Sequence, residues 1–437
     1  MHWYFQISDF KILEITSTPN ISDINGYNQM PYDRILTLIE RYGIFLALAS
    51  AYGILSPDFG ARTSLDDLRE ANIHAAASAN IIKQLIWTGL FAAFFVCFLR
   101  ETAISSPLLN RWGLIFILLG ATAVFFASTL WSEAKAFTTK RTIFQIFLIF
   151  DVFFGVYFSC KHKTFNKNIR FIALLISIFT IISIAKGTGF TEIGLASYQS
   201  HKNSFGAIIL AVFSIYTCLK LRYTDLYILI PLCIFLAMSL SKTSIALSTV
   251  ILLLSLVNFK FSKFIFSAAY YTTVTIFLII PMTASYLNIL WYPSQDKDPS
   301  FMTGRGLVWQ TLYPTALDDK SINLGHGFGA YFGTGRVPDA LNINHPFLPS
   351  LVQSHNSYLD LALQLGFPLS ILLTFILFTL VRRIDVKQLY IAGFAFLIYG
   401  ISEAAFFRDQ QGIWIMFITV FSWSLVKISI FRNGFIK

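Results

Sequence analysis

Residues 354–372 read SHNSYLDLALQLGFPLSIL and place a histidine and an asparagine directly before a long apolar run. A helix needs about 20 apolar residues to cross the roughly 30 Å hydrocarbon layer of a membrane. Runs of this kind recur along nearly the whole chain, separated by short polar interruptions. The composition agrees, because 55% of the residues are hydrophobic and 13% are charged, whereas soluble domains carry about a quarter charged residues. The sequence therefore predicts an all-α, polytopic integral membrane protein.

The apolar runs predict about twelve transmembrane helices. The expected spans are residues 36–55, 84–99, 112–131, 143–160, 171–186, 205–220, 227–241, 244–258, 264–290, 356–381, 388–406 and 413–430. The predicted organisation is a cytoplasmic N-terminal tail (1–34), transmembrane helices 1–9 (35–290), a large periplasmic loop (291–355), and transmembrane helices 10–12 with a short cytoplasmic C-terminal tail (356–437). The start, MHWYFQISDFKILEI, lacks a basic segment followed by an apolar core and a cleavage site, so we expect the tail to be retained.

The charges between the spans predict the orientation of the chain. Lys and Arg dominate the N-terminal tail and the loops on its side, so this side is predicted to be cytoplasmic. The loops on the other side mix both signs of charge. The formal net charge of +10 is therefore largely a signal of topology. Its spread over many short loops argues against a nucleic-acid-binding protein.

The sequence gives no support for a disulfide framework, a metal centre or ATP hydrolysis. The four cysteines, Cys97, Cys160, Cys218 and Cys233, fall in or at the ends of expected helices and form no CxxC pair. The pattern GxxxxGK[ST] of nucleotide-binding P-loops is absent from the sequence. We therefore predict neither a bound metal nor a cofactor.

One connection is much longer than the others. Residues 291–355 form an extracytoplasmic loop of about 65 residues, rich in Gly, Pro, Asp and Asn, which is too long for an idle connector. Its first part, DPSFMTGRGLVWQTLYP (298–314), predicts a turn at Gly304–Gly306 followed by a short helix on or re-entering the membrane. Its middle, LGHGFGAYFGTGR (324–336), carries glycines that allow close backbone approach, either to a ligand or to neighbouring helices. The loop is where we expect the function to reside.

Polar residues at the extracytoplasmic ends of the spans form a candidate site for an anionic substrate. A cation in a membrane segment costs about 2.5–3.5 kcal/mol and is usually paired or functional. Lys and Arg can bind phosphate or pyrophosphate, and a neutral histidine can accept a proton from a hydroxyl. The chemistry predicted is glycosyl transfer with a lipid-linked pyrophosphate as leaving group. The candidate catalytic residues are His355, Arg305 and Lys242, and the candidate substrate- and pyrophosphate-binding residues are His201, Lys202, Asn203 and Asn356.

Each of these residues also has a structural interpretation. Lys242 can extend its ammonium group to the membrane interface, and Arg305 can anchor its loop on lipid headgroups. His201 can cap the helix that follows it, with Asn203. Outside the candidate set, Glu403 and Arg408 in SEAAFFRDQQG are expected to form an ion pair with each other.

Five motifs occur in one order and on one predicted face: HKNSFG (201–206), SKTS (241–244), GRGLVW (304–309), LGHGFGAYF (324–332) and HNSYLDLALQLGFP (355–368). Together they resemble the O-antigen ligase and polymerase superfamily of bacterial polysaccharide enzymes, and within it the branch of the exopolysaccharide polymerases. The similarity extends from about Thr188 to Phe407. The resemblance implies transfer of a glycan from an undecaprenyl pyrophosphate carrier on the extracytoplasmic face of the inner membrane, without a metal or a nucleotide sugar.

The resemblance also implies roles for single residues. His355 matches the proposed base of the family, and Arg305 matches the arginine that starts the helix of the long loop. Lys242 stands where relatives commonly have arginine, so both can bind phosphate. Lys202 and Asn203 match a basic and polar pair before a helix. Gly366 matches the glycine of the last motif, and Pro368 departs from the pattern and is expected to kink the tenth span.

The sequence leaves the acceptor open. A polymerase transfers the glycan to a growing glycan, with a chain-length regulator as a further candidate partner. A ligase transfers it to a lipid A core or to a protein. A transporter of lipid-linked glycans is a third alternative, but its key groups should lie near the membrane midplane in both halves of the chain.

Overall fold

The fold is described from a computed structural model. It covers residues 31–60, 81–101, 106–219, 221–279, 305–332, 334, 338, 341, 348, 351–408 and 412–432. Residues 1–30 of the predicted N-terminal tail, the end of the expected ninth span and much of the long loop lie outside the described residues. All seven candidate site residues lie within them.

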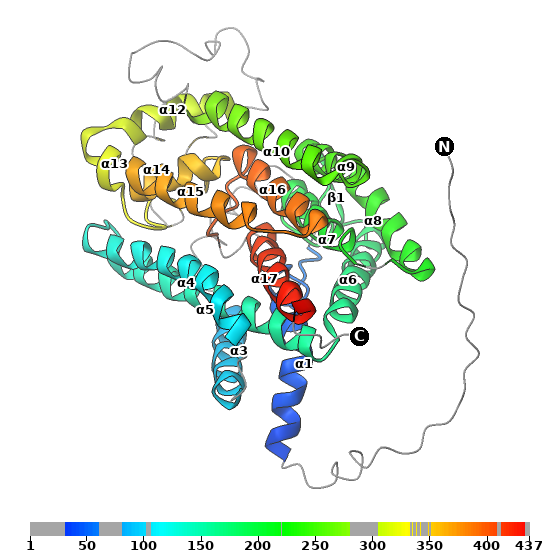
Figure 1. Cartoon of the computed structure of the whole chain (residues 1–437). Coiled ribbons are helices and arrows are strands. Elements are labelled where there is room, and N and C mark those ends of the chain that lie inside the picture. Colours follow the sequence, from blue (N-terminus) through cyan, green and yellow to red (C-terminus); the bar gives the residue numbers. More distant parts are fainter. Residues whose placement is uncertain are drawn as a thin grey trace, which may run out of the picture.

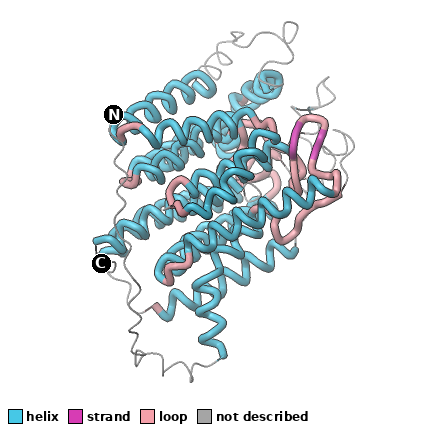
Figure 2. The backbone as a smooth tube through the Cα atoms, turned by 90° about the vertical axis from the view of Figure 1, so that its right-hand side faces the viewer, coloured by secondary structure: helices cyan, strands magenta, loops and turns pink. Residues whose placement is uncertain are grey.

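The described part of the chain is almost entirely helical, which confirms the all-α class. The helices are α1 (Pro31–Ala51), α3 (Ile81–Arg100), α4 (Ser106–Ala127), α5 (Lys135–Lys161), α6 (Phe165–Ala185), α7 (Lys202–Tyr216), α8 (Leu226–Met238), α9 (Lys242–Leu256), α10 (Phe259–Val274), α12 (Arg305–Leu317), α13 (Asp319–Leu324), α14 (Ser357–Leu365), α15 (Phe367–Arg382), α16 (Lys387–Ser402) and α17 (Gly412–Arg432). Short 3-10 turns occupy Ser128–Leu130 and Tyr223–Asp225, and a π-helical turn, Thr275–Ile279, extends α10. The strands β1 (Phe190–Thr191) and β2 (Gly194–Leu195) form an antiparallel hairpin at the edge of the bundle (Figure 2).

Three of the described helices are long and apolar enough to cross a membrane: α3, α5 and α6. Shorter apolar helices, including α7, α8, α9 and α15, accompany them. Their lengths and compositions agree with a membrane protein. The count of twelve spans stays a prediction.

Helix α17 lies in the middle of the bundle (Figure 1). Residues 412–426 are buried on every side, because α5, α7 and α16 pack around them. The side-chain amide of Gln145 in α5 forms two hydrogen bonds across this apolar core. It donates to the carbonyl oxygen of Phe407 at 2.8 Å and accepts from Trp414 Nε1 at 3.0 Å. A satisfied amide of this kind fixes the register of two helices in an apolar bundle.

The expected span 356–381 is two helices, α14 and α15, so the prediction of one continuous helix is wrong. They meet at Gly366, whose φ of +77° lies in the left-handed region. A Cβ atom here would lie 2.4 Å from the carbonyl carbon of Asn323, so the end of α13 packs directly on the glycine backbone. Pro368 lies in the first turn of α15, where its missing N–H costs nothing, and it starts a helix instead of kinking one.

Candidate functional site

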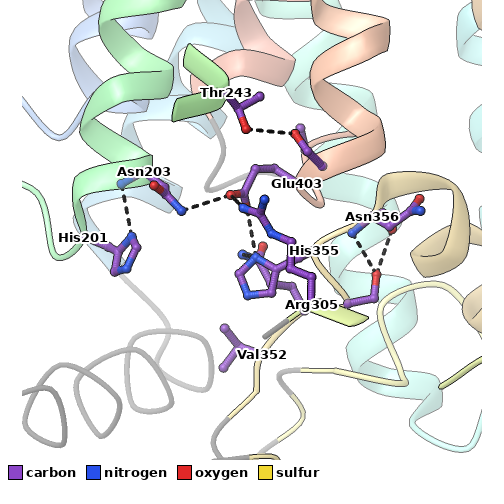
Figure 3. Close-up of polar contacts among 12 residues, drawn as sticks. His201, Asn203, Thr243, Arg305, Val352, His355, Asn356 and Glu403 are labelled. Carbon is purple, nitrogen blue, oxygen red and sulfur yellow. Dashed lines mark hydrogen bonds and ion pairs between the residues drawn. The ribbon is translucent and has the colours of Figure 1, made fainter. Parts of the chain in front are cut away.

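The buried carboxylate of Glu403 joins the elements of the site (Figure 3). Glu403 follows the last residue of α16 and is 6% exposed. Its Oε2 accepts a hydrogen bond from His355 Nδ1 at 2.9 Å, and its Oε1 accepts from Asn203 Nδ2 at 3.0 Å. The guanidinium group of Arg305 forms an ion pair with Oε1. Residues from α7, α12 and the segment before α14 thus meet on one side chain, and they belong to three of the five motifs.

The charge of Glu403 determines which nitrogen of His355 carries the proton. The ion pair with the guanidinium group of Arg305 favours the ionised form of this buried carboxylate. Glu403 is therefore ionised at neutral pH and can only accept hydrogen bonds. Nδ1 of His355 must then donate, and Nε2 of the neutral ring has a free lone pair. Among the described residues Nε2 has no hydrogen-bond partner.

The backbone of His355 is held in a conformation that side chains rarely adopt. Its φ is +55°, in the left-handed region. For a residue other than glycine such a conformation costs of the order of 1–3 kcal/mol and persists only where the surroundings impose it. The preceding Ser354 is fixed on both sides, because Trp309 Nε1 donates to its carbonyl oxygen at 2.9 Å and its N–H donates to Asp360 Oδ1 at 2.9 Å.

Asn356, next to His355, caps a helix. Its Oδ1 accepts from the backbone N–H groups of Tyr358 at 2.9 Å and Leu359 at 3.2 Å, which starts α14. The residue is fully buried. The predicted contact of Asn356 with a sugar hydroxyl stays a prediction, and the capping geometry shows how Asn356 sets the direction in which the chain leaves His355.

His201 also caps a helix, which confirms the structural interpretation of this residue. Its Nδ1 accepts from the backbone N–H of Asn203 at 3.1 Å at the start of α7. Burial lowers the pKa of His201 to about 4, and this effect outweighs the attraction of Glu403. The ring is therefore neutral at physiological pH, and the side chain adds no positive charge to the site.

Two lysines provide positive charge near this cluster. Lys202 starts α7 and donates from Nζ to the carbonyl oxygen of Ile193 in the β hairpin at 2.9 Å. Lys242 starts α9, is exposed, and lies near enough to Lys202 for the two ammonium groups to repel each other. Neither lysine has a carboxylate partner within the described part of the chain. Two uncompensated cations at neighbouring helix starts are suited to an anion with more than one charge.

The expected ion pair between Glu403 and Arg408 is wrong. Arg408 pairs with Asp360 instead, with its Nε 3.0 Å from Oδ2. Glu403 is thus a site residue that sequence reasoning missed. One signal was available in the sequence. The predicted face held several cations without partners, and an acidic residue on the same face, such as Glu403, needs a cation as its partner.

Comparison with known families bears directly on this geometry. Residues 227–374 match the family model described as O-antigen ligase. This segment, about a third of the chain, is similar to an O-antigen ligase domain. The matched part of this domain includes Lys242, Arg305, His355 and Asn356, whereas Glu403 and the residues around His201 lie outside it. No protein of curated function and no solved structure matches the chain.

The match confirms the predicted superfamily, and the branch of the exopolysaccharide polymerases stays a prediction. With its apolar helices, an O-antigen ligase domain indicates a membrane protein with a role in joining or polymerising glycans. The family implies a lipid-linked glycan as substrate and an acceptor for it.

Proposed function

We propose that the protein is a bacterial polysaccharide polymerase. It transfers a glycan from an undecaprenyl pyrophosphate carrier to a growing glycan chain, on the periplasmic side of the inner membrane and without a metal ion. The observation that carries this proposal is the pairing of His355 Nδ1 with Glu403, which leaves Nε2 as a proton acceptor beside a cluster of cations. The positive charges in the loops on the N-terminal side support the orientation.

In the proposed reaction, His355 acts as the general base. Nε2 accepts the proton of an acceptor hydroxyl as its oxygen attacks the anomeric carbon of the donor sugar. The bond between that carbon and the pyrophosphate oxygen breaks, and the leaving group departs with the electron pair. Glu403 stabilises the imidazolium ion that forms and holds the ring in the required tautomer.

The cations act on the leaving group. Lys202 and Lys242 bind the pyrophosphate, and Arg305 contributes the N–H groups that Glu403 does not occupy. Negative charge grows on the pyrophosphate as it departs. Cations that bind it more tightly in the transition state than in the ground state therefore accelerate the reaction.

A ligase is the second candidate, and the description of the matched family favours it. Both reactions use the same donor, base and leaving group, and they differ in the acceptor. In the ligase the acceptor hydroxyl belongs to a lipid A core or to a protein.

The test is the glycan profile of a bacterial strain that lacks the gene and is complemented with wild type or with His355→Ala. The polymerase is supported if wild type restores long chains on the carrier and His355→Ala, inserted at normal abundance, leaves single repeats there. Restored attachment of preformed chains to a lipid A core or protein identifies the ligase. Full restoration by His355→Ala contradicts the proposed base.

A further inference from the structure

We propose that the ion pair of Asp360 and Arg408 is a positioning element that holds His355 in its reactive conformation. This inference rests on the proposed function, because it concerns the base of that reaction. Neither residue reaches Glu403 or the cation cluster through any described contact, so the pair acts through the backbone of residues 352–354.

The pair forms hydrogen bonds with the backbone before His355 at two residues, Ser354 and Val352. Asp360 Oδ1 accepts from the backbone N–H of Ser354 at 2.9 Å, while its Oδ2 accepts from Arg408 Nε at 3.0 Å. The same guanidinium donates from NH1 to the carbonyl oxygen of Val352 at 3.0 Å. Asp360 is 3% exposed, so water competes little for these bonds. The two side chains thus fix the backbone on both sides of Gln353.

These bonds add to a local turn around His355, in which the Ser354 hydroxyl donates to the carbonyl oxygen of Asn356 at 2.8 Å and accepts from its N–H at 3.2 Å. His355 has a φ of +55°, which an isolated residue of this type would leave for the right-handed or extended region. A change of φ at His355 swings the imidazole, and its Nδ1 can then no longer stay 2.9 Å from Glu403. Release of Val352 and Ser354 therefore separates the base from the carboxylate that sets its tautomer.

Glu403 is held from the same helix start by a separate contact. The hydroxyl of Ser357 donates to the Glu403 carbonyl oxygen at 2.8 Å and accepts from the Ala405 N–H at 2.8 Å. The first turns of α14 therefore hold both partners of the His355–Glu403 contact. Ser357 binds the backbone of Glu403, and Asp360 binds the backbone before His355. Loss of Asp360 moves only the histidine side of this arrangement, so it should affect the chemical step and leave the cations that bind the donor in place.

The experiment measures transfer kinetics of the purified full-length protein with lipid-linked glycan extracted from the deletion strain. The variants are Asp360→Asn, which keeps an oxygen for Ser354 but loses the charge that holds Arg408, and Asp360→Leu, which loses both. The matched control is Asp225→Asn, whose carboxylate accepts from Arg170 Nε at 2.7 Å and NH2 at 2.9 Å at the opposite end of the bundle. Each variant is also made in a His355→Ala background, and its thermal midpoint is recorded.

We expect Asp360→Leu to lower kcat by about 100-fold, the effect of an ångström-scale misplacement of a catalytic group. KM for the donor should stay near its wild-type value, Asp360→Asn should fall between wild type and Asp360→Leu, and Asp225→Asn should keep the wild-type kcat. In the His355→Ala background Asp360→Leu should cause no further loss, because there is no base left to position.

Two results would overturn the inference. One is a wild-type kcat for both Asp360 variants, and the other is a further loss in the His355→Ala background as large as the loss in the wild-type background, which indicates a purely structural role. If instead His355→Ala itself has the wild-type kcat, the proposed base is wrong, and that failure is separate from the failure of the positioning role.

Discussion

Replacing Glu403 by glutamine should inactivate the protein although the two side chains have nearly the same shape. Oε1 of Glu403 accepts from Arg305 and from Asn203 Nδ2, and both of these groups can only donate. The amide oxygen of a glutamine must therefore occupy the Oε1 position, and its NH2 group must occupy the Oε2 position beside His355. There it donates to Nδ1, so the ring proton moves to Nε2 and the lone pair of the base is lost.

The expected loss is large. A wrong histidine tautomer beside a replaced carboxylate lowers kcat by up to about 10⁴-fold in an enzyme with a comparable histidine–acid pair. Glu403→Gln also leaves the guanidinium of Arg305, which is 14% exposed, without its counter-charge. Removing one partner of a buried ion pair destabilises a protein by about 3–5 kcal/mol, and the retained amide oxygen should keep the cost near the lower end.

The assay is single-turnover transfer by the purified protein with extracted lipid-linked glycan, normalised to folded protein. The matched control is Glu133→Gln, since Glu133 accepts from Nδ1 of another histidine, His326, at 3.1 Å but is half exposed and outside the cluster. Glu133→Gln should keep the wild-type rate. A Glu403→Gln rate above about a tenth of the wild-type rate would refute the assignment of the His355 tautomer.

Three further predictions concern charge, pH and backbone. Lys242→Ala should lower kcat/KM for the donor by about 10- to 100-fold, the value of a hydrogen bond to a charged group, while Lys242→Arg keeps most of it; donor titrations measure both. Because the pKa of His201 is about 4 in the folded protein and 6.5 when solvated, up to about 3 kcal/mol of stability should be lost as pH falls from 6.5 to 4. His201→Asn keeps a capping group and should flatten this slope in pH-dependent unfolding, and an unchanged slope would exclude His201 as its cause. Gly366→Ala should lower the unfolding free energy by more than about 1 kcal/mol, because φ is +77° and the new methyl group meets Asn323; an unchanged thermal midpoint would contradict the packing described.

The helical class was predictable because the length and composition of an apolar run are enough to identify a membrane-spanning helix. They could not predict that residues 356–381 form two helices, since the reason lies in the close approach of Asn323 to the Gly366 backbone, more than 40 positions away in the sequence. The motif order placed His355, Arg305 and Asn203 on one face, and the structure brings them together on Glu403.

The partners of Glu403 and Arg408 were predicted wrongly from the sequence. Glu403 and Arg408 are neighbours in the chain, and sequence distance favoured their pairing. In the folded protein Arg408 lies against Asp360, and Glu403 instead receives Arg305 from the long loop. Choices of this kind depend on which buried charge would otherwise stay uncompensated, and only the three-dimensional arrangement decides that.

The most direct test of the proposed base is the transfer rate of purified His355→Ala, compared with wild type and with His326→Ala. His326 is another histidine of the long loop that lies 3.1 Å from a glutamate, so it controls for loss of any loop histidine. If His355 Nε2 is the general base, His355→Ala should be slower than wild type by about 10²- to 10⁴-fold while His326→Ala keeps most of the rate. Equal rates for wild type and for folded His355→Ala would contradict the proposed mechanism at its centre.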